Sequence, residues 1–177
     1  MIMKRPVLYI AAIITLLISF SACEKYLDLE PQYTQDAENF FENPSDYERA
    51  LIGAYDLLQS AFLTSWIGEI ASDNSIAGGE SVTDTEGLHE IDEMRHDAVN
   101  TELRNIFRWN YAGVTRANYI LEHRDNIDFE GKETILAEAS FLRAYYYFEL
   151  VKYFGAVPLV VDRRLGATEV TEVDRAP

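Results

Sequence analysis

The chain has 177 residues, which is enough to bury one hydrophobic core of ordinary size. Hydrophobic residues make up 48% of it and aromatic residues 12%, a composition that excludes a disordered protein. Acidic residues outnumber basic ones by 30 to 15, for a net charge of −15, and such a surface repels the phosphates of nucleic acids. The charge therefore argues against a nucleic-acid-binding role, and it is compatible with an uncharged ligand or a basic protein partner.

The first 22 residues have the organisation of a secretory leader. A short basic stretch, 1–5, precedes an apolar run over 7–20 that would rise only ~21 Å as a helix, too little to cross a ~30 Å hydrocarbon core. The small residues Ser21 and Ala22 follow, and then Cys23, the only cysteine of the chain. This order predicts a lipoprotein signal peptide over 1–22, with lipidation of the Cys23 thiol as the membrane anchor.

An extended tether is predicted for residues 23–42, followed by a first helix. The helix is expected to start at Asn43-Pro44-Ser45, where Ser45 and Glu48 have the spacing of a capping box. Residues 64–72 predict a short second helix. The apolar stripe of the first helix repeats at three- and four-residue steps and consists of Tyr47, Leu51, Ala54, Tyr55, Leu58 and Phe62.

The connection over 73–100 is polar, contains glycine and has no clear periodicity. A segment this long inside a helical domain is typically a functional loop or disordered, and a short helix near Leu88 to Met94 is the third interpretation.

Two long helices are predicted after this connection. Asn100 or Thr101 caps the first, which ends before a turn at 125–131. The second runs from about Lys132 to Phe154, and we expect it to be covered on two sides because apolar residues lie on two of its faces. Gly155 suits a left-handed position that ends the helix, and 156–161 predicts an extended segment. The two faces of the second helix consist of Ile135, Ala139, Leu142, Tyr146 and Leu150, and of Phe141, Tyr145 and Phe148.

The expected fold is therefore all-α, made of antiparallel helix pairs of tetratricopeptide-like form. Small residues such as Gly113 and Ala139 lie where the two long helices could approach closely. One helix pair cannot bury its own faces. We therefore expect 43–177 to form a helical domain that is incomplete at its C-terminal end.

Four stretches in this order resemble the N-terminal region of SusD/RagB-type lipoproteins. They are Cys23 to Pro31 with its Leu-Asp pair, Phe40-Phe41 with Ala50 to Tyr55, Trp109 with Arg116 to Leu121, and Ala137 to Leu159. The resemblance implies an outer-membrane lipoprotein that binds oligosaccharide, or less often peptide, above a SusC-like TonB-dependent transporter. It also implies a longer protein whose C-terminal half takes part in ligand binding.

Ligand binding is expected in the region 64–100. Sugar recognition needs an aromatic face for the ring and planar polar groups for its hydroxyls. The polar segment and the tryptophan just before it offer both, but no motif fixes the individual contacts. The candidate ligand-binding residues are Trp66, Asp73, Asn74, His89, Arg95 and His96.

No other chemistry is predicted. The histidines around 89–96 do not form the H-E-x-x-H pattern of a zinc site, and no phosphate loop or nucleophile motif is present, so we expect no metal, no cofactor and no catalysis. Trp109 and the run Tyr145-Tyr146-Tyr147 lie at core spacing and are interpreted as packing residues.

Two alternatives to nutrient binding remain. A lipid-anchored helical scaffold that binds only proteins would carry its exposed aromatic residues on a concave helix face, whereas a sugar site would carry them on 64–100. A surface glycan hydrolase would need two suitably spaced carboxylates with a shifted pKa.

The leader yields a direct prediction: the mature protein begins at Cys23, and this residue carries lipid. Mass spectrometry of the mature N-terminus from membranes is expected to find the acyl chains. An unlipidated N-terminus, or protein recovered from the cytosol, would contradict it.

Overall fold

The computed structural model describes residues 40–81, 83–161, 163–165 and 173–176. The predicted leader, Cys23 and the tether as far as residue 39 lie outside these ranges. The described residues belong to one compact unit, Phe40–Pro177.

The fold of this unit is all-α, as predicted. Among the described residues, β structure is limited to one isolated antiparallel bridge between Pro158 and Arg175. None of the described helices is long and apolar enough to span a bilayer. The helical elements are α2 (Pro44–Asp56), the 3-10 helix η2 (Leu57–Ser60), α3 (Ala61–Ile70), α4 (Glu86–Asp92), α5 (Thr101–Glu122) and α6 (Lys132–Phe154).

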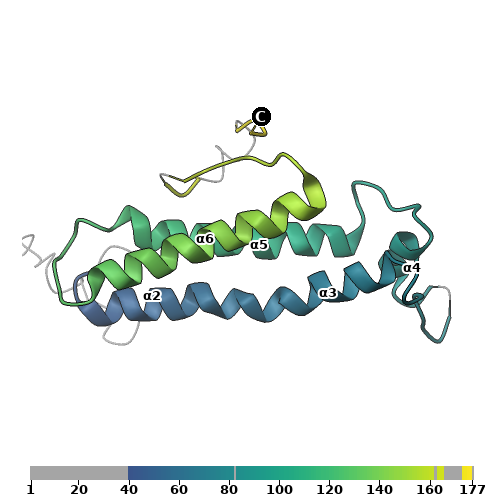
Figure 1. Cartoon of the computed structure of the whole chain (residues 1–177), viewed down its shortest axis with the longest axis horizontal. Helices are drawn as coiled ribbons and strands as arrows, with labels where there is room; N and C mark the ends of the chain where they lie inside the picture. Colours follow the sequence, from purple (N-terminus) through teal and green to yellow (C-terminus); the bar gives the residue numbers. More distant parts are fainter. Residues whose placement is uncertain (1–39, 82, 162, 166–172, 177) are drawn as a thin grey trace, which may run out of the picture. The chain divides into compact units, whose positions relative to one another are not determined.

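The long helices α5 and α6 form the predicted antiparallel hairpin, and α2, η2 and α3 follow one another along its side (Figure 1). Helix α2 contacts both α5 and α6, whereas α3 contacts α5 and the short α4. The main core lies where α2, α5 and α6 meet and is built from aromatic and branched aliphatic side chains, among them Phe41, Tyr47, Leu51, Val114, Ile120, Leu142, Tyr146 and Leu150.

The start of α2 differs from the predicted capping box. The helix begins at Pro44, and Asn43 is its N-cap, so Ser45 lies inside the first turn. The carboxylate of Asp46 accepts the backbone N–H groups of Glu42 and Asn43, each at 3.2 Å, and pairs with Arg49 at 2.6 Å. Pro44 favours this register because proline fits the first helical position, where its missing N–H costs no hydrogen bond.

The stripe predicted along the first helix is broken in the structure. Tyr47, Leu51 and Ala54 are buried, but Tyr55 and Phe62 are exposed, and Leu57 enters the core instead. The 3-10 turn η2 interrupts the helix at Leu57–Ser60. Since a 3-10 helix has three residues per turn and not 3.6, it changes which later side chains face the core.

The structure confirms two predictions for the α5–α6 hairpin, namely the cap at Asn100 and the close approach of the two helices at Gly113. The Asn100 side chain accepts the N–H groups of Glu102 at 3.0 Å and Leu103 at 3.1 Å. A Cβ placed on Gly113 would lie 2.4 Å from the ring of Tyr146, so only glycine allows α6 to pack here. The five residues predicted for the core face of α6 are all buried.

Buried tyrosines tie the helices to one another through backbone carbonyls. The hydroxyl of Tyr146 donates to Ala54 O at 2.6 Å, that of Tyr47 to His123 O at 2.6 Å, and that of Tyr153 to Thr64 O at 2.7 Å. Ala54 lies in the last turn of α2, where carbonyls lack an intrahelical partner. Burial raises the pKa of Tyr146 to about 12 and raises the pKa of Tyr47 and of Tyr153.

Most of the second apolar face of α6 is exposed among the described residues. Phe141 is 68% exposed and Phe148 62%, with Val151 also exposed one turn further on, whereas Tyr145 is partly buried against the main core. The prediction that α6 is covered on two sides is therefore wrong for the described part of the chain. The reason is that α2 and α5 both pack on the face that carries Ala139, Leu142 and Tyr146.

Helix α6 ends at Gly155, as predicted, with φ 64° and ψ −131°. This combination has a positive φ but is not the left-handed helical conformation that we expected, and it is accessible essentially only to glycine.

We predict that Gly113→Ala destabilises the hairpin by about 1–3 kcal/mol, because the new methyl group overlaps the Tyr146 ring. Chemical denaturation followed by circular dichroism measures the loss. Gly68→Ala is the matched control: no atom lies within 4 Å of its Cβ position on the exposed face of α3, so it is expected to gain up to about 1 kcal/mol. Equal stability of the two variants would contradict the close packing.

Candidate functional site

The end of the unit that carries the predicted ligand-binding residues is held by its own small core. The loop end, as we call the described residues of 66–100, contains α4 (Figure 1). Buried side chains from α3, α4 and the start of α5 pack there: Ile67, Ile70, Leu88, Ile91 and Ile106.

The connection 73–100 is organised by side-chain to backbone hydrogen bonds. The Asn100 amide donates to Gly87 O at 2.9 Å and to the Glu90 carboxylate at 2.7 Å, while Asp92 accepts the N–H of Ala77 at 2.9 Å. Of the three interpretations of this segment, the structure supports the short helix, which runs over Glu86–Asp92 in place of 88–94.

The six predicted ligand-binding residues lie on α3, α4 and the connections beside them, and within the described ranges no hydrogen bond or ion pair joins any two of them. Trp66 is 45% exposed, and the four residues Asp73, Asn74, Arg95 and His96 are also exposed. His89 is partly buried on α4, with its Nε2 atom enclosed and lacking a hydrogen-bond partner among the described residues.

Arg95 is already engaged by neighbouring acids. Its guanidinium is hydrogen-bonded to Glu93 and lies 4.0 Å from Glu90, and the bond to Glu93 raises the pKa of Arg95. Arg95 is the only lysine or arginine in the sequence 73–100, which contains eight acidic residues: Asp73, Glu80, Asp84, Glu86, Glu90, Asp92, Glu93 and Asp97. The loop end is therefore strongly acidic.

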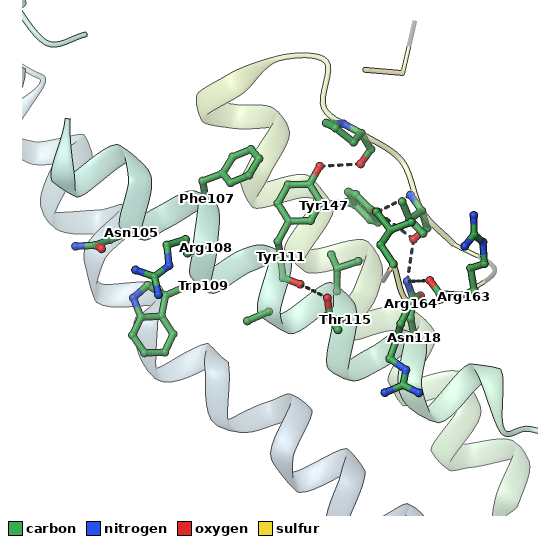
Figure 2. A pocket seen from close by; sticks show the side chains of 15 residues that line it. Asn105, Phe107, Arg108, Trp109, Tyr111, Thr115, Asn118, Tyr147, Arg163 and Arg164 are labelled. Atoms are coloured by element: carbon green, nitrogen blue, oxygen red, sulfur yellow. Dashed lines mark hydrogen bonds between the residues drawn. The ribbon is translucent and has the colours of Figure 1, made fainter. Parts of the chain in front are cut away.

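A concave region lies between α5 and the chain that follows α6, away from the predicted ligand-binding residues. We call the described residues 156–161 and 163–165 the strap, and the cavity between it and α5 the Trp109 cleft. The cleft has a volume of about 570 Å³, within the usual range of ligand pockets. Figure 2 shows side chains of α5 along its floor, with the strap on the other side.

The strap is held in place by side chains of α5 and α6. Tyr111 donates to Pro158 O at 2.7 Å, and the Tyr147 hydroxyl donates to Val160 O at 3.0 Å and accepts the Val160 N–H at 2.7 Å. The antiparallel bridge from Pro158 to Arg175 adds a backbone contact. Burial raises the pKa of Tyr111 and of Tyr147, because the charged phenolate is poorly solvated there.

Asn118 and Arg143 hold the middle of the strap. The Asn118 amide donates to Val160 O at 2.9 Å and to Arg163 O at 3.1 Å, and its oxygen accepts from Arg143 at 3.0 Å. Arg143 also donates to Val161 O. Burial lowers the pKa of the Arg143 guanidinium. These side chains are occupied by the strap and not offered to a ligand.

The prediction that Trp109 is a packing residue is wrong. Its side chain is 45% exposed, whereas its neighbour Asn110 is buried and donates to Ile106 O at 2.9 Å. Ile106, Asn110 and Gly113 are spaced three and four residues apart and mark the buried face of α5 at this point. Because asparagine is polar, the apolar pattern by itself does not assign Asn110 to the core. Of the tyrosine run, Tyr146 and Tyr147 are buried, as expected of packing residues.

A smaller hollow of about 410 Å³ adjoins the cleft across Trp109. Both cavities are lined by Asn105 and Trp109, and the smaller one continues to the α2–α3 side through Asp56, Gln59 and Phe62. Trp109 thus separates two concave surfaces.

The described residues hold no group of three or more His, Cys, Asp or Glu side chains arranged to bind a metal ion. Among the described residues that line the two hollows, Asp56 is the one carboxylate. It borders the smaller hollow and is paired with Arg116 at 3.2 Å.

Residues 25–176 match the SusD-like family model described as "Starch-binding associating with outer membrane". Curated relatives from Formosa agariphila include SusD-like protein P38, 30% identical over 82% of this chain, and SusD-like protein P25, 24% identical over 83%. SusD-like protein P2 of the same organism is 23% identical over 96%. The chain spans only 28%, 30% and 34% of these three relatives. No solved structure is significantly similar to the chain.

The buried tyrosines predict a loss of stability at high pH. Because the folded pKa of Tyr147 lies above the ordinary value of about 10, its contribution is complete below that value and is lost as pH rises through the folded pKa. Urea unfolding across this range should show a falling free energy of unfolding. Tyr147→Phe should be about 1 kcal/mol less stable at neutral pH and lose less on alkalinisation. An unchanged pH slope in the variant would contradict the role of Tyr147.

Proposed function

Because the chain belongs to the SusD-like family of starch-binding, outer-membrane-associated proteins, we propose that it captures an oligosaccharide at the cell surface and passes it to a TonB-dependent outer-membrane transporter. The match over residues 25–176 is the observation that carries this proposal. The relatives are about three times as long as this chain, so the ligand and the transporter partner are part of the proposal.

The proposed anchor is the lipid on Cys23. The leader over 1–22 and the small pair before the cysteine support it. Several acyl chains on one residue give stable membrane attachment, whereas a single chain is marginal. With this anchor, residues 23–42 would serve as a tether between the outer membrane and the helical domain, 43–177.

The proposed glycan contact region is the loop end. Trp66 offers a half-exposed indole, and the exposed side chains of Asp73, Asn74 and His96 offer planar polar groups for hydroxyls. The excess of carboxylates there favours a neutral ligand over an anionic one. The role is binding, and no catalytic residue is assigned.

A protein-binding scaffold is the second candidate function, and the uncovered face of α6 favours it. Phe141, Phe148 and Val151 form an exposed apolar stripe with no described cover. Such a stripe is typical of a protein interface. The two functions are compatible if a partner protein rests on the helices while the glycan binds at the loop end.

We predict that the chain binds soluble starch in affinity electrophoresis and maltoheptaose in calorimetry. Trp66→Ala is expected to weaken binding about tenfold, because loss of one aromatic stacking contact costs about 1.4 kcal/mol. Phe148→Ala is the matched control: it removes a similarly exposed aromatic side chain from α6 and should leave glycan affinity unchanged.

Binding that Phe148→Ala abolishes and Trp66→Ala does not would move the glycan site away from the loop end. Absence of binding to every neutral and charged glycan tested, together with co-purification of a protein partner, would replace the proposal with the scaffold function.

A further inference from the structure

The part of the Trp109 cleft that the structure describes is lined by basic and not by acidic side chains, in contrast to the acidic chain as a whole. Its fifteen described lining residues include Arg108, Arg163 and Arg164, and none of these fifteen is Asp or Glu. This lining is found in a chain with twice as many acidic as basic residues. At physiological ionic strength charges are screened over about 8 Å, so a ligand inside the cleft would be governed by these local guanidinium groups and not by the net charge.

Aromatic side chains form the floor of the cleft between its arginine side chains. Figure 2 shows Asn105, Arg108 and Trp109 toward one end of the cleft, and Asn118, Arg163 and Arg164 toward the other, with Tyr111 and Tyr147 between them. At the end of the cleft near Asn118, two contacts hold the Arg164 guanidinium. Its Cζ atom lies 3.8 Å from the centroid of the Tyr119 ring, and its Nε atom pairs with the Glu122 carboxylate at 2.8 Å.

Two polar side chains next to Trp109 make no polar contact within the described part of the chain. Neither Asn105 nor Arg108 makes a hydrogen bond or ion pair with another described residue. Arg108 is exposed, and the Trp109 indole next to it is 45% exposed. An amide, a guanidinium and an indole face are the groups that bind a sugar ring carrying an acidic substituent.

A protein helix is a poorer occupant of this surface. An apolar helix face laid over Trp109 would cover Asn105 and Arg108, and a buried polar group without a partner costs about 1–3 kcal/mol. Sugar hydroxyls and a carboxylate or sulfate would pair with the same groups. The exposed stripe of Phe141, Phe148 and Val151 on α6 is apolar and is not part of the cleft lining, so it fits a protein partner better.

We infer that the Trp109 cleft binds an anionic saccharide, one bearing uronate or sulfate groups, with Trp109 against a sugar ring and Arg108 on the acidic group. The inference rests on the proposed glycan-binding function and adds to it a second site with its own class of ligand. It assigns this role to the cleft because the acidic loop end repels such a ligand.

The test is calorimetry on the full chain with trigalacturonate, the neutral trisaccharide maltotriose and polyglutamate as probes. Trigalacturonate is expected to bind at least about tenfold more tightly than maltotriose, and to weaken as salt is raised, because the attraction is between exposed charges. Trp109→Ala should weaken trigalacturonate binding about tenfold. Arg108→Gln should weaken it about fivefold and reduce its salt dependence.

Exposed residues of the same types, outside the cleft and outside the loop end, supply matched controls. Phe148→Ala on α6 and Arg104→Gln on α5 should leave trigalacturonate affinity unchanged, and all four variants should keep the parent's helical circular dichroism. A variant that lost its helical signal would be replaced by Trp109→Phe or Arg108→Lys, which are expected to retain part of the affinity.

The other outcomes overturn the inference in distinguishable ways. Binding of maltotriose that depends on Trp66, without a preference for trigalacturonate, would leave the proposed function standing and refute the anionic site. Tighter binding of polyglutamate, lost in Trp109→Ala, would make the cleft a groove for acidic protein segments. Failure of both saccharides to bind would refute the inference and the proposed function together.

Discussion

The contact between Gly113 and the ring of Tyr146 determines how the two long helices can pack. The absence of a side chain on α5 at this point lets the aromatic ring of α6 lie against the backbone, and the same tyrosine then reaches Ala54 O at the end of α2. One residue thereby joins three helices. The alignment of α2 and η2 on the hairpin follows from this arrangement, because the carbonyl that Tyr146 binds lies where α2 gives way to the 3-10 turn.

The strap depends on the same hairpin. Tyr111 and Asn118 project from α5, and Arg143 and Tyr147 from α6, and together they hold the strap mainly through its backbone groups. Strap residues are thus positioned by hydrogen bonds that do not depend on their side-chain identity. This leaves the strap side chains Arg163 and Arg164, with the α5 residues Asn105, Arg108 and Trp109, to set the chemistry of the cleft.

The unit separates its charges. Eight of the chain's 30 acidic residues lie within 73–100, whereas the described lining of the Trp109 cleft has three arginines and no acid. A net charge of −15 describes neither region. A ligand with an acidic substituent is repelled by the first region and attracted by the arginines of the second, and a neutral ligand is not, so the two regions can discriminate between ligands that differ only in this substituent.

The sequence alone determined the elements in which the local signal was strong. Periodic apolar residues and end signals gave α6 over Lys132–Phe154, the Asn100 cap of α5 and the Gly155 stop, because capping and backbone conformation depend on a few neighbouring residues. The family resemblance also came from residue patterns, and the match over 25–176 confirms it. The start of α2 at Asn43-Pro44-Ser45 was correct, but its capping box was placed two residues too late, because Asn43–Asp46 and Ser45–Glu48 have the same spacing and only the folded chain selects between them.

Tertiary structure decided which helix faces are covered. Trp109 and Phe148 have the hydrophobicity of core residues, but burial depends on which neighbours a face meets, and the hairpin and α2 meet the faces that carry Asn110 and Leu142. The cleft likewise joins α5 to a strap some fifty residues later, a pairing that no local pattern encodes. Composition gave the total charge of the chain, and only the fold could gather arginines from both segments around one aromatic surface.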